Sequence, residues 1–238
     1  MPAPIVLLHG FTQTGDAWRQ VRARLESRGR HVVAPDLRGH GAASATRPVD
    51  LAAVLADLDA LVDGAVLGGY SMGGRLALAY AARQPGRVRR LVLVGASPGL
   101  EDRRERDARR RDDELLAARI ETSGVEAFAR EWALLPLFAG QPPAVAAAAH
   151  AERLRQTPEG LAAALRGLGT GTLPSVWDAL PGLELPVTLV VGQRDAKFRA
   201  VAEAMADRLP FGRIVVVPGA GHAVHLEAPA VVAAELAG

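Results

Sequence analysis

The residue of this chain best suited to do chemistry is Ser71, in the run Gly69-Tyr70-Ser71-Met72-Gly73-Gly74-Arg75. The run contains the pattern Gly-x-Ser-x-Gly and comes just after the apolar residues 65–67. In a nucleophile elbow, a strand turns sharply into a helix at such a serine and exposes its hydroxyl. Glycine-rich turns also occur for purely structural reasons, so the pattern needs support from elsewhere in the chain. The expected partners are a base, a residue that orients the base, and an oxyanion hole.

Two later loops carry the side chains that such a serine needs. Asp195 follows the apolar run 187–191, and His222 follows the apolar run 214–217. Serine, acid and histidine occur in this chain order in α/β-hydrolases. We therefore predict Ser71, Asp195 and His222 as catalytic residues. In that arrangement His222 takes the proton of Ser71, while Asp195 fixes the imidazole tautomer and stabilises the imidazolium.

Other acidic and imidazole groups fit this role less well. Asp36 precedes Ser71 in the chain and fits a turn-stabilising role. His225 begins an expected helix, so we predict that it caps the helix or packs beside it. His9 and His40 lie in glycine-flanked loops and are predicted to be structural, shaping the floor of the pocket.

Backbone N–H groups are expected to form the oxyanion hole. One donor should follow the nucleophile and the other should lie in the loop after the first strand, which selects the N–H groups of Met72 and Phe11. Met72 also begins a helix, whose N-terminal dipole favours developing negative charge. Together with the triad order and His9-Gly10, these features predict an α/β-hydrolase.

The elements around these residues alternate as that fold requires. Short apolar runs, each interpreted as a strand, occur at residues 5–8, 31–34, 65–67, 91–94, 187–191 and 214–217, with helical segments between most of them. Repeated βαβ units predict a parallel sheet covered on both faces. The first strand begins too near Met1 to leave room for two leading strands. We therefore expect an α/β fold of the α/β-hydrolase type, with a reduced, mostly parallel sheet of about six strands.

Between Pro98 and about Thr172 the alternation stops. Ala, Leu, Arg and Glu dominate this stretch in helical periods, and glycine and proline divide it into about four helices, at Gly124, Pro136, Pro142-Pro143, Pro158 and Gly167. An all-helical insertion after a parallel strand would cover the pocket as a cap. We predict an α/β-hydrolase core of residues 1–98 and 172–238 and a helical cap insertion of residues 99–171.

Composition limits the class of protein. A chain of 238 residues fits one α/β domain with an inserted subdomain. The absence of cysteine excludes disulfides and thiolate metal sites, and we expect neither a metal nor another cofactor. No run approaches the roughly 20 apolar residues of a membrane span, and the first residues do not resemble a signal peptide. We expect a cytoplasmic protein that does not act at a membrane.

The basic residues do not indicate a nucleic-acid partner. The formal net charge is only +2, and aromatic residues make up 4% of the chain. A nucleic-acid-binding surface usually combines a strong basic excess with aromatic stacking platforms. We expect a small-molecule substrate instead, acted on by a monomer or a small homo-oligomer.

Outside the triad, the chain resembles a particular family, the 2-succinyl-6-hydroxy-2,4-cyclohexadiene-1-carboxylate synthases of menaquinone biosynthesis. The resemblance runs nearly end to end. Besides the Ser71 run, its most specific parts are Ser97-Pro98-Gly99-Leu100, the Arg-rich run 106–113, Trp132 with Leu135-Pro136-Leu137-Phe138, Leu154-Arg155, and residues 192–198 and 220–227. Ordinary esterases share the elbow and the histidine loop, but seldom the pieces around Lys197 and Phe138.

The resemblance implies an elimination rather than a hydrolysis. Members of the family expel pyruvate from 2-succinyl-5-enolpyruvyl-6-hydroxy-3-cyclohexene-1-carboxylate, and the product is the conjugated cyclohexadiene. Ser71, activated by His222, would act as the base, and no acyl-enzyme is needed. The substrate carries several carboxylates, which arginine side chains bind bidentately. By resemblance, the substrate contacts would come from Tyr70, Arg75, Arg109, Trp132 and Arg155.

Two alternatives stay open on the sequence. The same triad would serve an esterase, a thioesterase or a carbon–carbon bond hydrolase. The chain could also be a ligand-binding relic of the fold without useful turnover, although an intact triad and oxyanion loop argue against it. Near the pocket, Ala133 stands beside Trp132 where the family can carry an aromatic residue, so this part of the wall is expected to differ.

Overall fold

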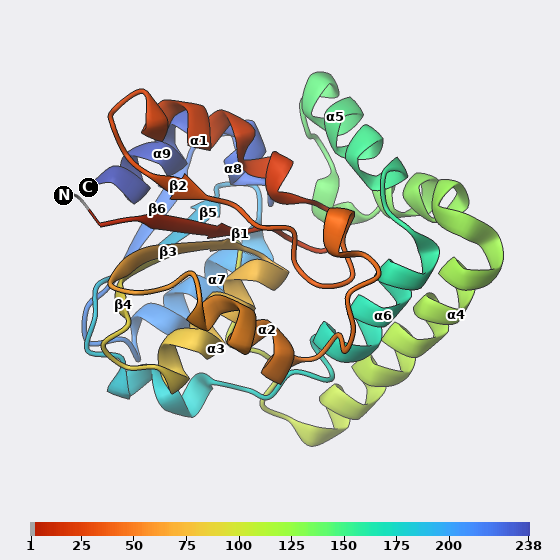
Figure 1. Ribbon diagram of the computed structural model, residues 1–238, viewed down its shortest axis with the longest axis horizontal. Coiled ribbons are helices and arrows are strands. Elements are labelled where there is room, and N and C mark those ends of the chain that lie inside the picture. The colour runs from red at the N-terminus through yellow and green to blue at the C-terminus, as the bar shows by residue number, and fades with distance from the viewer. Residues whose placement is uncertain (1–2) are drawn as a thin grey trace.

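A computed structural model describes residues 3–238, and at its centre lies a sheet of six parallel strands (Figure 1). In order across the sheet the strands are β2 (Val32–Val33), β1 (Ile5–Leu8), β3 (Ala65–Tyr70), β4 (Val88–Val94), β5 (Val187–Gly192) and β6 (Gly212–Val217). The predicted α/β class and the predicted number of strands are confirmed. Because the strands are parallel, their carboxyl ends meet at one edge of the sheet.

Alternate side chains of the strands enter two separate hydrophobic cores, one on each face of the sheet. In β1, Ile5 and Leu7 belong to one core, Val6 and Leu8 belong to the other, and all four are fully buried. This period of two follows from the pleat of a strand. Since both faces are covered, the strand is apolar throughout, which is why it could be recognised from the sequence.

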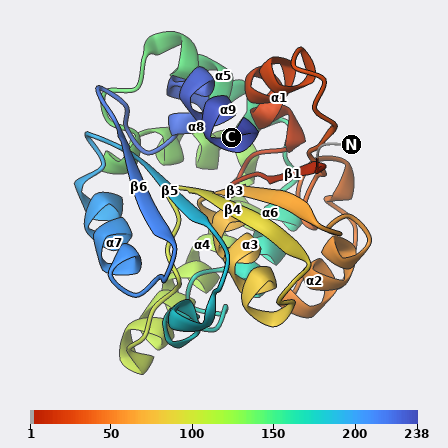
Figure 2. The same cartoon turned by 90° about the vertical axis from the view of Figure 1, so that its left-hand side faces the viewer.

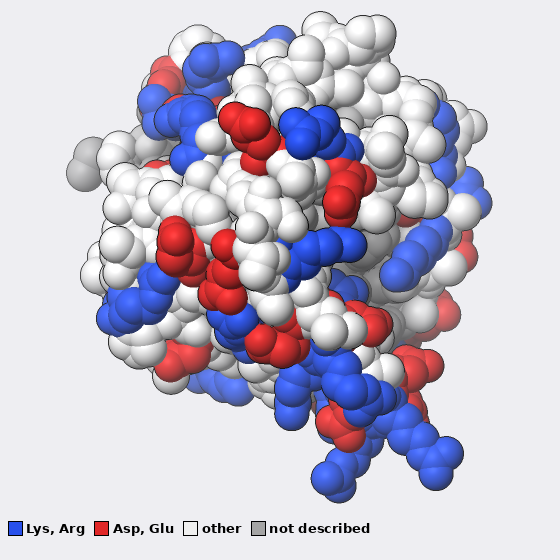
Figure 3. Space-filling model, turned by 90° about the vertical axis from the view of Figure 1, so that its right-hand side faces the viewer, with Lys and Arg blue, Asp and Glu red and all other residues white. Residues whose placement is uncertain are grey.

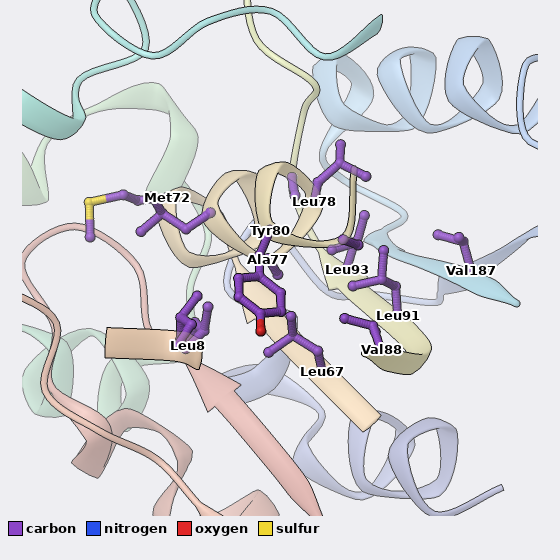
Figure 4. Close-up of a cluster of buried hydrophobic side chains, with 14 of the residues drawn as sticks. Leu8, Leu67, Met72, Ala77, Leu78, Tyr80, Val88, Leu91, Leu93 and Val187 are labelled. Atoms are coloured by element: carbon purple, nitrogen blue, oxygen red, sulfur yellow. The ribbon is translucent and has the colours of Figure 1, made fainter. Parts of the chain in front are cut away.

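Helices cover both faces of the sheet (Figure 2). One face packs against α1 (Arg19–Glu26), α8 (Val224–Glu227) and α9 (Pro229–Ala237), and the other against α2 (Leu51–Asp59), α3 (Met72–Arg83) and α7 (Ala196–Ala206). Figure 4 shows part of the second core, where Leu78 of α3 lies near Leu93 of β4 and Tyr80 of α3 lies near Leu67 of β3. Nine of the 12 residues of α3 are buried, so the helix that follows Ser71 is firmly supported.

In the connection from β4 to β5, three helices lie over the carboxyl ends of the strands and form a cap (Figure 1): α4 (Arg103–Ala133), α5 (Pro143–Leu154) and α6 (Pro158–Leu168), with η3 (Pro136–Phe138) between α4 and α5. The chain then returns to β5 through η4 (Trp177–Gly182), which packs against α3. Two further short turns, η1 (Gly15–Trp18) and η2 (Gly41–Ala43), lie in the core loops. The helical break predicted at Gly124 is a kink inside α4, with φ 77° and ψ 171°. α4 packs along α6 around a small core that includes Ile120, Phe128 and Leu165.

The surface of the cap side carries both signs of charge. Figure 3 shows basic and acidic side chains interspersed over this face, with basic ones gathered at the end where α4 begins. This mixture differs from the uniform positive patch of a nucleic-acid-binding face. Within residues 3–238, no helix has the length and apolar character that crossing a membrane requires.

Glycines let α3 approach the sheet closely, and this approach sets the turn at Ser71. A Cβ on Gly73 would lie 2.3 Å from the carbonyl oxygen of Leu8, and a Cβ on Gly69 would lie 2.5 Å from that of Gly73. Ser71 itself has φ 49° and ψ −107°, a conformation that residues other than glycine rarely adopt. Such a backbone persists only where the surroundings hold it, and here it raises Ser71 above the end of β3.

The close approach at Gly73 gives a direct test of this support. We expect Gly73→Ala to lower the free energy of unfolding by about 1–3 kcal/mol, because the added methyl group pushes α3 away from β1. Urea denaturation of the two proteins measures the change. Gly182→Ala is the matched control, since its Cβ would meet no heavy atom within 4 Å. Equal stability of the two variants would contradict the role of Gly73.

Candidate active site

A large cavity lies between the cap and the carboxyl ends of the strands. Its volume is about 600 Å³, within the range of small-molecule sites. The loops after β1, β3, β4, β5 and β6 contribute to its wall, together with residues of α4 and α6. Of the residues predicted for the site, those that line the cavity are Phe11, Ser71, Met72, Arg75, Arg109, Trp132, Asp195 and His222.

The predicted acid and base are in direct contact. Nδ1 of His222 lies 2.6 Å from Oδ2 of Asp195, and both side chains are buried. The other oxygen of Asp195 accepts a hydrogen bond of 3.2 Å from the N–H of Phe198 and so caps α7. This division of the two oxygens fixes the carboxylate, which in turn orients the imidazole. Nδ1 of His222 therefore carries the proton, and Nε2 is the atom able to accept one.

Space for the imidazole of His222 comes from a glycine and three aromatic rings. A Cβ on Gly95, which follows β4 with φ 53°, would lie 2.8 Å from the ring. The rings of Phe198, Tyr70 and Phe138 lie 4.4, 5.2 and 6.5 Å from that of His222, centroid to centroid. The base is thus packed on several sides, and only its cavity side is open to a substrate.

Ser71 shares the cavity with His222, but no hydrogen bond joins the two side chains among the described residues. Nε2 of His222 has no hydrogen-bond partner in residues 3–238. Hydrogen bonds between catalytic groups are often long or misaligned before substrate binds. The arrangement therefore places an imidazole nitrogen, unpaired among the described residues, and a half-buried serine in one cavity.

Phe11 and Met72, whose N–H groups are the predicted oxyanion-hole donors, both line the cavity. Met72 is the first residue of α3, so its N–H has no acceptor within the helix. The loop after β1 is held by hydrogen bonds from Gln13 N–H to Gly10 O and from Gly10 N–H to the Gln13 side chain. These bonds do not use the N–H of Phe11. Both N–H groups can therefore serve a negatively charged oxygen.

Two arginines place positive charge in the cavity wall. Arg75 lies one helical turn after Ser71, and no described carboxylate forms an ion pair with it; its buried Nε has no hydrogen-bond partner in residues 3–238. Burial, helped by the positive charge of Arg109, lowers the pKa of Arg75 to about 10, so it stays charged at neutral pH. Arg109 is half exposed and contacts Asp113 at 2.8 Å.

Trp132 belongs to an aromatic wall of the cavity. Its ring lies 5.4 Å from that of Phe11 and 5.2 Å from that of Phe128. Trp132 and Leu135 also line a second hollow, between the two halves of α4 on either side of the kink at Gly124, so these two side chains separate that hollow from the main cavity. Ala133 is absent from the residues that line either space.

Arg155, which the resemblance placed on the substrate, lies outside the cavity. Its guanidinium contacts Asp16 at 2.9 Å and Glu152 at 3.2 Å, and the side chain is exposed. The residue that turns inward is Arg153, two positions earlier on α5 and only 4% exposed. Arg155 follows the last residue of α5 and points away from the face that Arg153 occupies, so its contact with the substrate stays a prediction.

Arg153 lines a small recess that the sequence analysis missed. The guanidinium lies 5.1 Å from the centre of the Phe138 ring, and its buried Nε has no hydrogen-bond partner in residues 3–238. Tyr70 also lines this recess, rather than the main cavity. Burial lowers the pKa of Arg153 and raises that of Tyr70, so one is a poorly solvated cation and the other a neutral hydroxyl. Lys197, also missed, lines the main cavity.

Three other histidines, His9, His40 and His225, are buried in the packing around the site. Nε2 of His9 accepts a hydrogen bond of 2.9 Å from Leu37 N–H, and His40 packs on His9 and Phe11. His225 lies between the rings of Trp18 and Tyr70, at 4.8 and 4.1 Å. Burial lowers the pKa values of His9, His40 and His225 to about 4, 3 and 3. All three rings are therefore neutral at physiological pH.

Asp36 stabilises the turns of two loops. Its carboxylate accepts hydrogen bonds of 2.8 Å from the N–H groups of Gly15 and Ala42. It lies outside the residues that line the cavity. The geometry thus agrees with a structural role for this acidic side chain.

Comparisons with known proteins agree with this geometry. The model of the family described as "Alpha/beta hydrolase family" matches residues 5–235. A Bacillus subtilis (strain 168) protein named "Putative 2-succinyl-6-hydroxy-2,4-cyclohexadiene-1-carboxylate synthase" is 39% identical, over 94% of this chain and 85% of its own. A Klebsiella pneumoniae protein (strain ATCC 700721 / MGH 78578) named as the same synthase is 32% identical, over 98% of this chain and 92% of its own.

The fold agrees as closely as the sequence. The solved structure of MenH from S. aureus superposes with a TM-score of 0.93 and 30% identity, over 98% of this chain and 91% of that one. The match spans the cap as well as the core. The chain therefore belongs to the alpha/beta hydrolase family and, within it, to the 2-succinyl-6-hydroxy-2,4-cyclohexadiene-1-carboxylate synthases.

Proposed function

We propose that this protein eliminates pyruvate from 2-succinyl-5-enolpyruvyl-6-hydroxy-3-cyclohexene-1-carboxylate and so forms 2-succinyl-6-hydroxy-2,4-cyclohexadiene-1-carboxylate, a step of menaquinone biosynthesis. Membership of the synthase family supports this reaction. The observation in the structure that carries the proposal is the pairing of Ser71 and His222 with Arg75 in one cavity. The first two groups can move a proton, and the third needs an anion.

Arg75 argues for an anionic substrate on energetic grounds. A buried cation without a partner is costly, because the protein interior solvates it poorly. No carboxylate of residues 3–238 pairs with Arg75, and most of the cavity wall around it is apolar. A carboxylate of the bound substrate would supply the missing partner, held by the planar guanidinium in a fixed orientation.

Proton removal in this reaction falls to Ser71 and His222. The Ser71 hydroxyl takes a proton from the ring carbon while Nε2 of His222 accepts the hydroxyl proton, and Asp195 stabilises the imidazolium. The electron pair of the broken C–H bond moves onto the adjacent carbonyl group of the succinyl chain. The N–H groups of Phe11 and Met72 then stabilise the negative oxygen.

Loss of the leaving group completes the reaction. The electron pair returns from the oxygen and forms a new ring C=C bond at the succinyl-bearing carbon. The existing ring C=C bond shifts by one position, and the C–O bond to the enolpyruvyl group breaks. The departing enolate takes a proton and becomes pyruvate, for which the imidazolium of His222 is the nearest acid in the triad. No bond to Ser71 forms at any point, so water has no acyl-enzyme to hydrolyse.

Loss of either proton-transfer group should abolish pyruvate release. We expect Ser71→Ala and His222→Ala each to lower kcat by about 100-fold or more, the usual size of general acid–base catalysis. The double variant should lose little more, because groups that act as a unit are not additive. Coupling pyruvate to NADH oxidation by lactate dehydrogenase measures all three.

The same assay separates the elimination from its hydrolytic alternative. Wild-type protein is offered the ring substrate and, in parallel, a panel of aryl esters and thioesters. Fast ester turnover without pyruvate release would overturn the proposal and support a hydrolase. Pyruvate release that Ser71→Ala leaves intact would overturn the assigned base.

Removing the buried positive charge should weaken binding of the substrate. We expect Arg75→Met to lower kcat/KM by about tenfold to 100-fold, since a hydrogen bond to a charged group contributes about 1.5–3 kcal/mol. The loss should appear mainly in KM, because Arg75 holds the substrate before and during the reaction. Arg104→Met, an exposed change on α4, is the control. An undiminished rate with Arg75→Met would remove the argument for an anionic substrate.

Arg153 and Arg155 form a matched pair on one helix that tests which of them the substrate meets. We propose that Arg153, with Tyr70 beside it, supplies the cap's second positive charge. Arg153→Met should raise KM by about tenfold, whereas Arg155→Met should stay within about twofold, as exposed ion pairs contribute little. Steady-state pyruvate release measures both. The reverse order of effects would restore Arg155 as the binding residue.

A further inference from the structure

Arg194 makes contacts that the proposed reaction does not explain. It precedes Asp195 in the loop after β5, and its N–H donates to the carbonyl of Ala220 at 3.0 Å. The two terminal nitrogens of its guanidinium contact different groups. Nη2 contacts Oε2 of Glu227 at 2.9 Å, and Nη1 donates to the carbonyl oxygen of Gly140. One residue thus touches the acid loop, the base loop and the cap.

Glu227 links Arg194 to the loop that holds His222. Its side chain is only 3% exposed, and Oε2 also accepts a hydrogen bond of 2.9 Å from the N–H of Gly221. Gly221 immediately precedes His222. A Cβ on Gly221 would lie 3.1 Å from Oε1 of Glu227, so the carboxylate sits tightly under this turn. The position of Glu227 therefore sets the position of the base.

The loops that carry the acid and the base also touch through their backbones. A Cβ on Gly192 would lie 2.0 Å from the carbonyl oxygen of Gly221, a distance that only glycine permits. Oε1 of Gln193 accepts a hydrogen bond of 2.9 Å from Gly219 N–H. Together with the Arg194–Glu227 ion pair, these contacts make the two loops one unit that holds Asp195 and His222 at 2.6 Å.

On the cap side, Gly140 ends the segment that closes over the triad. Phe138, two residues earlier, packs on the His222 ring, and Leu135, Pro136 and Leu137 line the main cavity. Gly140 has φ 71°, and a Cβ there would lie 2.2 Å from Nη1 of Arg194, so the guanidinium fills the space beside this turn. The contact fixes the end of η3 over the active site.

Other contacts hold the cap to a different part of the core. Arg155 pairs with Asp16, Thr14 donates to Glu152, and Arg47 donates to the carbonyl of Glu159. These lie at the loops after β1 and β2. Among the hydrogen bonds of residues 3–238, that from Arg194 to Gly140 is the one that joins the cap to the loops of Asp195 and His222.

We propose that Arg194 is a positioning residue that couples closure of the cap segment 135–140 to the alignment of Asp195 and His222. When the segment is seated, one guanidinium holds Gly140 and Glu227 together. When the segment lifts, the bond to Gly140 breaks, while the ion pair with Glu227 keeps the two loops joined. This coupling extends the proposed function, and its kinetic test rests on that function.

Arginine suits this task because its planar fork donates in two directions at once. A lysine ammonium is a single point of charge at the end of a flexible chain. At this position it can keep the ion pair with Glu227 but cannot also hold Gly140 in the same geometry. The substitution Arg194→Lys therefore separates the cap contact from the loop contact.

Three variants test the coupling, each with kinetics and hydrogen exchange. Arg194→Met removes both contacts and should lower kcat/KM by about tenfold to 100-fold, the range that misplacement of a site can cost. Arg194→Lys should raise KM with kcat nearly unchanged, because the triad stays aligned. Glu227→Gln should act mainly on kcat, because the loop before His222 loses its charged partner. Pyruvate release measures the kinetic constants.

Hydrogen exchange followed by mass spectrometry reports, in the absence of substrate, on the contacts of Arg194 with Gly140 and with Glu227. Arg194→Met should speed exchange both in residues 135–141 and around Gly221, whereas Arg194→Lys should speed it in residues 135–141 alone. Arg213→Met is the matched control: it breaks an ion pair with Glu235 on β6 and α9, away from the cap, and should leave both readouts unchanged.

Several outcomes would overturn the coupling. Unchanged exchange in residues 135–141 in Arg194→Met would do so, as would exchange that rises evenly along the chain together with a lower unfolding temperature. Identical kinetics of Arg194→Lys and wild type would show that the bond to Gly140 does not affect the site. A wild-type protein that releases no pyruvate but shows the expected exchange pattern would instead defeat the proposed function and leave the coupling standing.

Discussion

The carboxylate of Asp195 joins the fold to the site. One oxygen caps α7 and the other holds the imidazole of His222 at 2.6 Å, so the carboxylate cannot turn without uncapping a helix. The two residues lie on separate loops after the neighbouring strands β5 and β6. Their contact therefore depends on the pairing of these strands, and on the glycines that let the loops touch. A buried carboxylate left without the imidazole would be costly, which ties the stability of this edge of the sheet to its chemistry.

Two buried arginines, one in the cavity wall and one in the recess beside it, lack an acidic partner among the described residues. Arg75 has no acidic partner among the described residues, Arg153 has none either, and Arg109 has Asp113. Each of the first two is largely removed from water, so the protein bears a cost that an anion would offset. A neutral ester would leave that cost in place. The arrangement thus favours a ligand with more than one carboxylate, and it agrees with the substrate implied by the synthase family.

The core was predictable because its signals are local. Buried strands appear as apolar runs, and the residues after β3, β5 and β6 stand where a parallel sheet brings them together. Strand ends were less visible: β4 begins at Val88, three residues before the apolar run, because Arg89 and Arg90 conceal it. Likewise β2 keeps only Val32 and Val33.

The inward faces of the cap were not predictable in the same way. α5 is so rich in alanine that its sequence shows no apolar stripe, and nothing local distinguishes Arg153 from Arg155. The structure shows which face of α5 turns inward: Ala149, one turn before Arg153, is buried on the same face. The contacts of Arg194 are equally hidden, since Gly140 lies 54 residues away in the chain.

The elbow of a hydrolase can serve an elimination because both reactions begin with the same proton transfer. In the proposed elimination, as in a hydrolysis, the serine hydroxyl loses its proton to the histidine, and an oxygen nearby accepts negative charge. What differs is the atom held against the hydroxyl: a carbonyl carbon leads to an acyl-enzyme, and a ring C–H bond leads to loss of a proton. Neither the triad nor the oxyanion donors can make that choice. It falls to the groups that orient the ring, and in this cavity those are the arginines and the cap segment that closes over them.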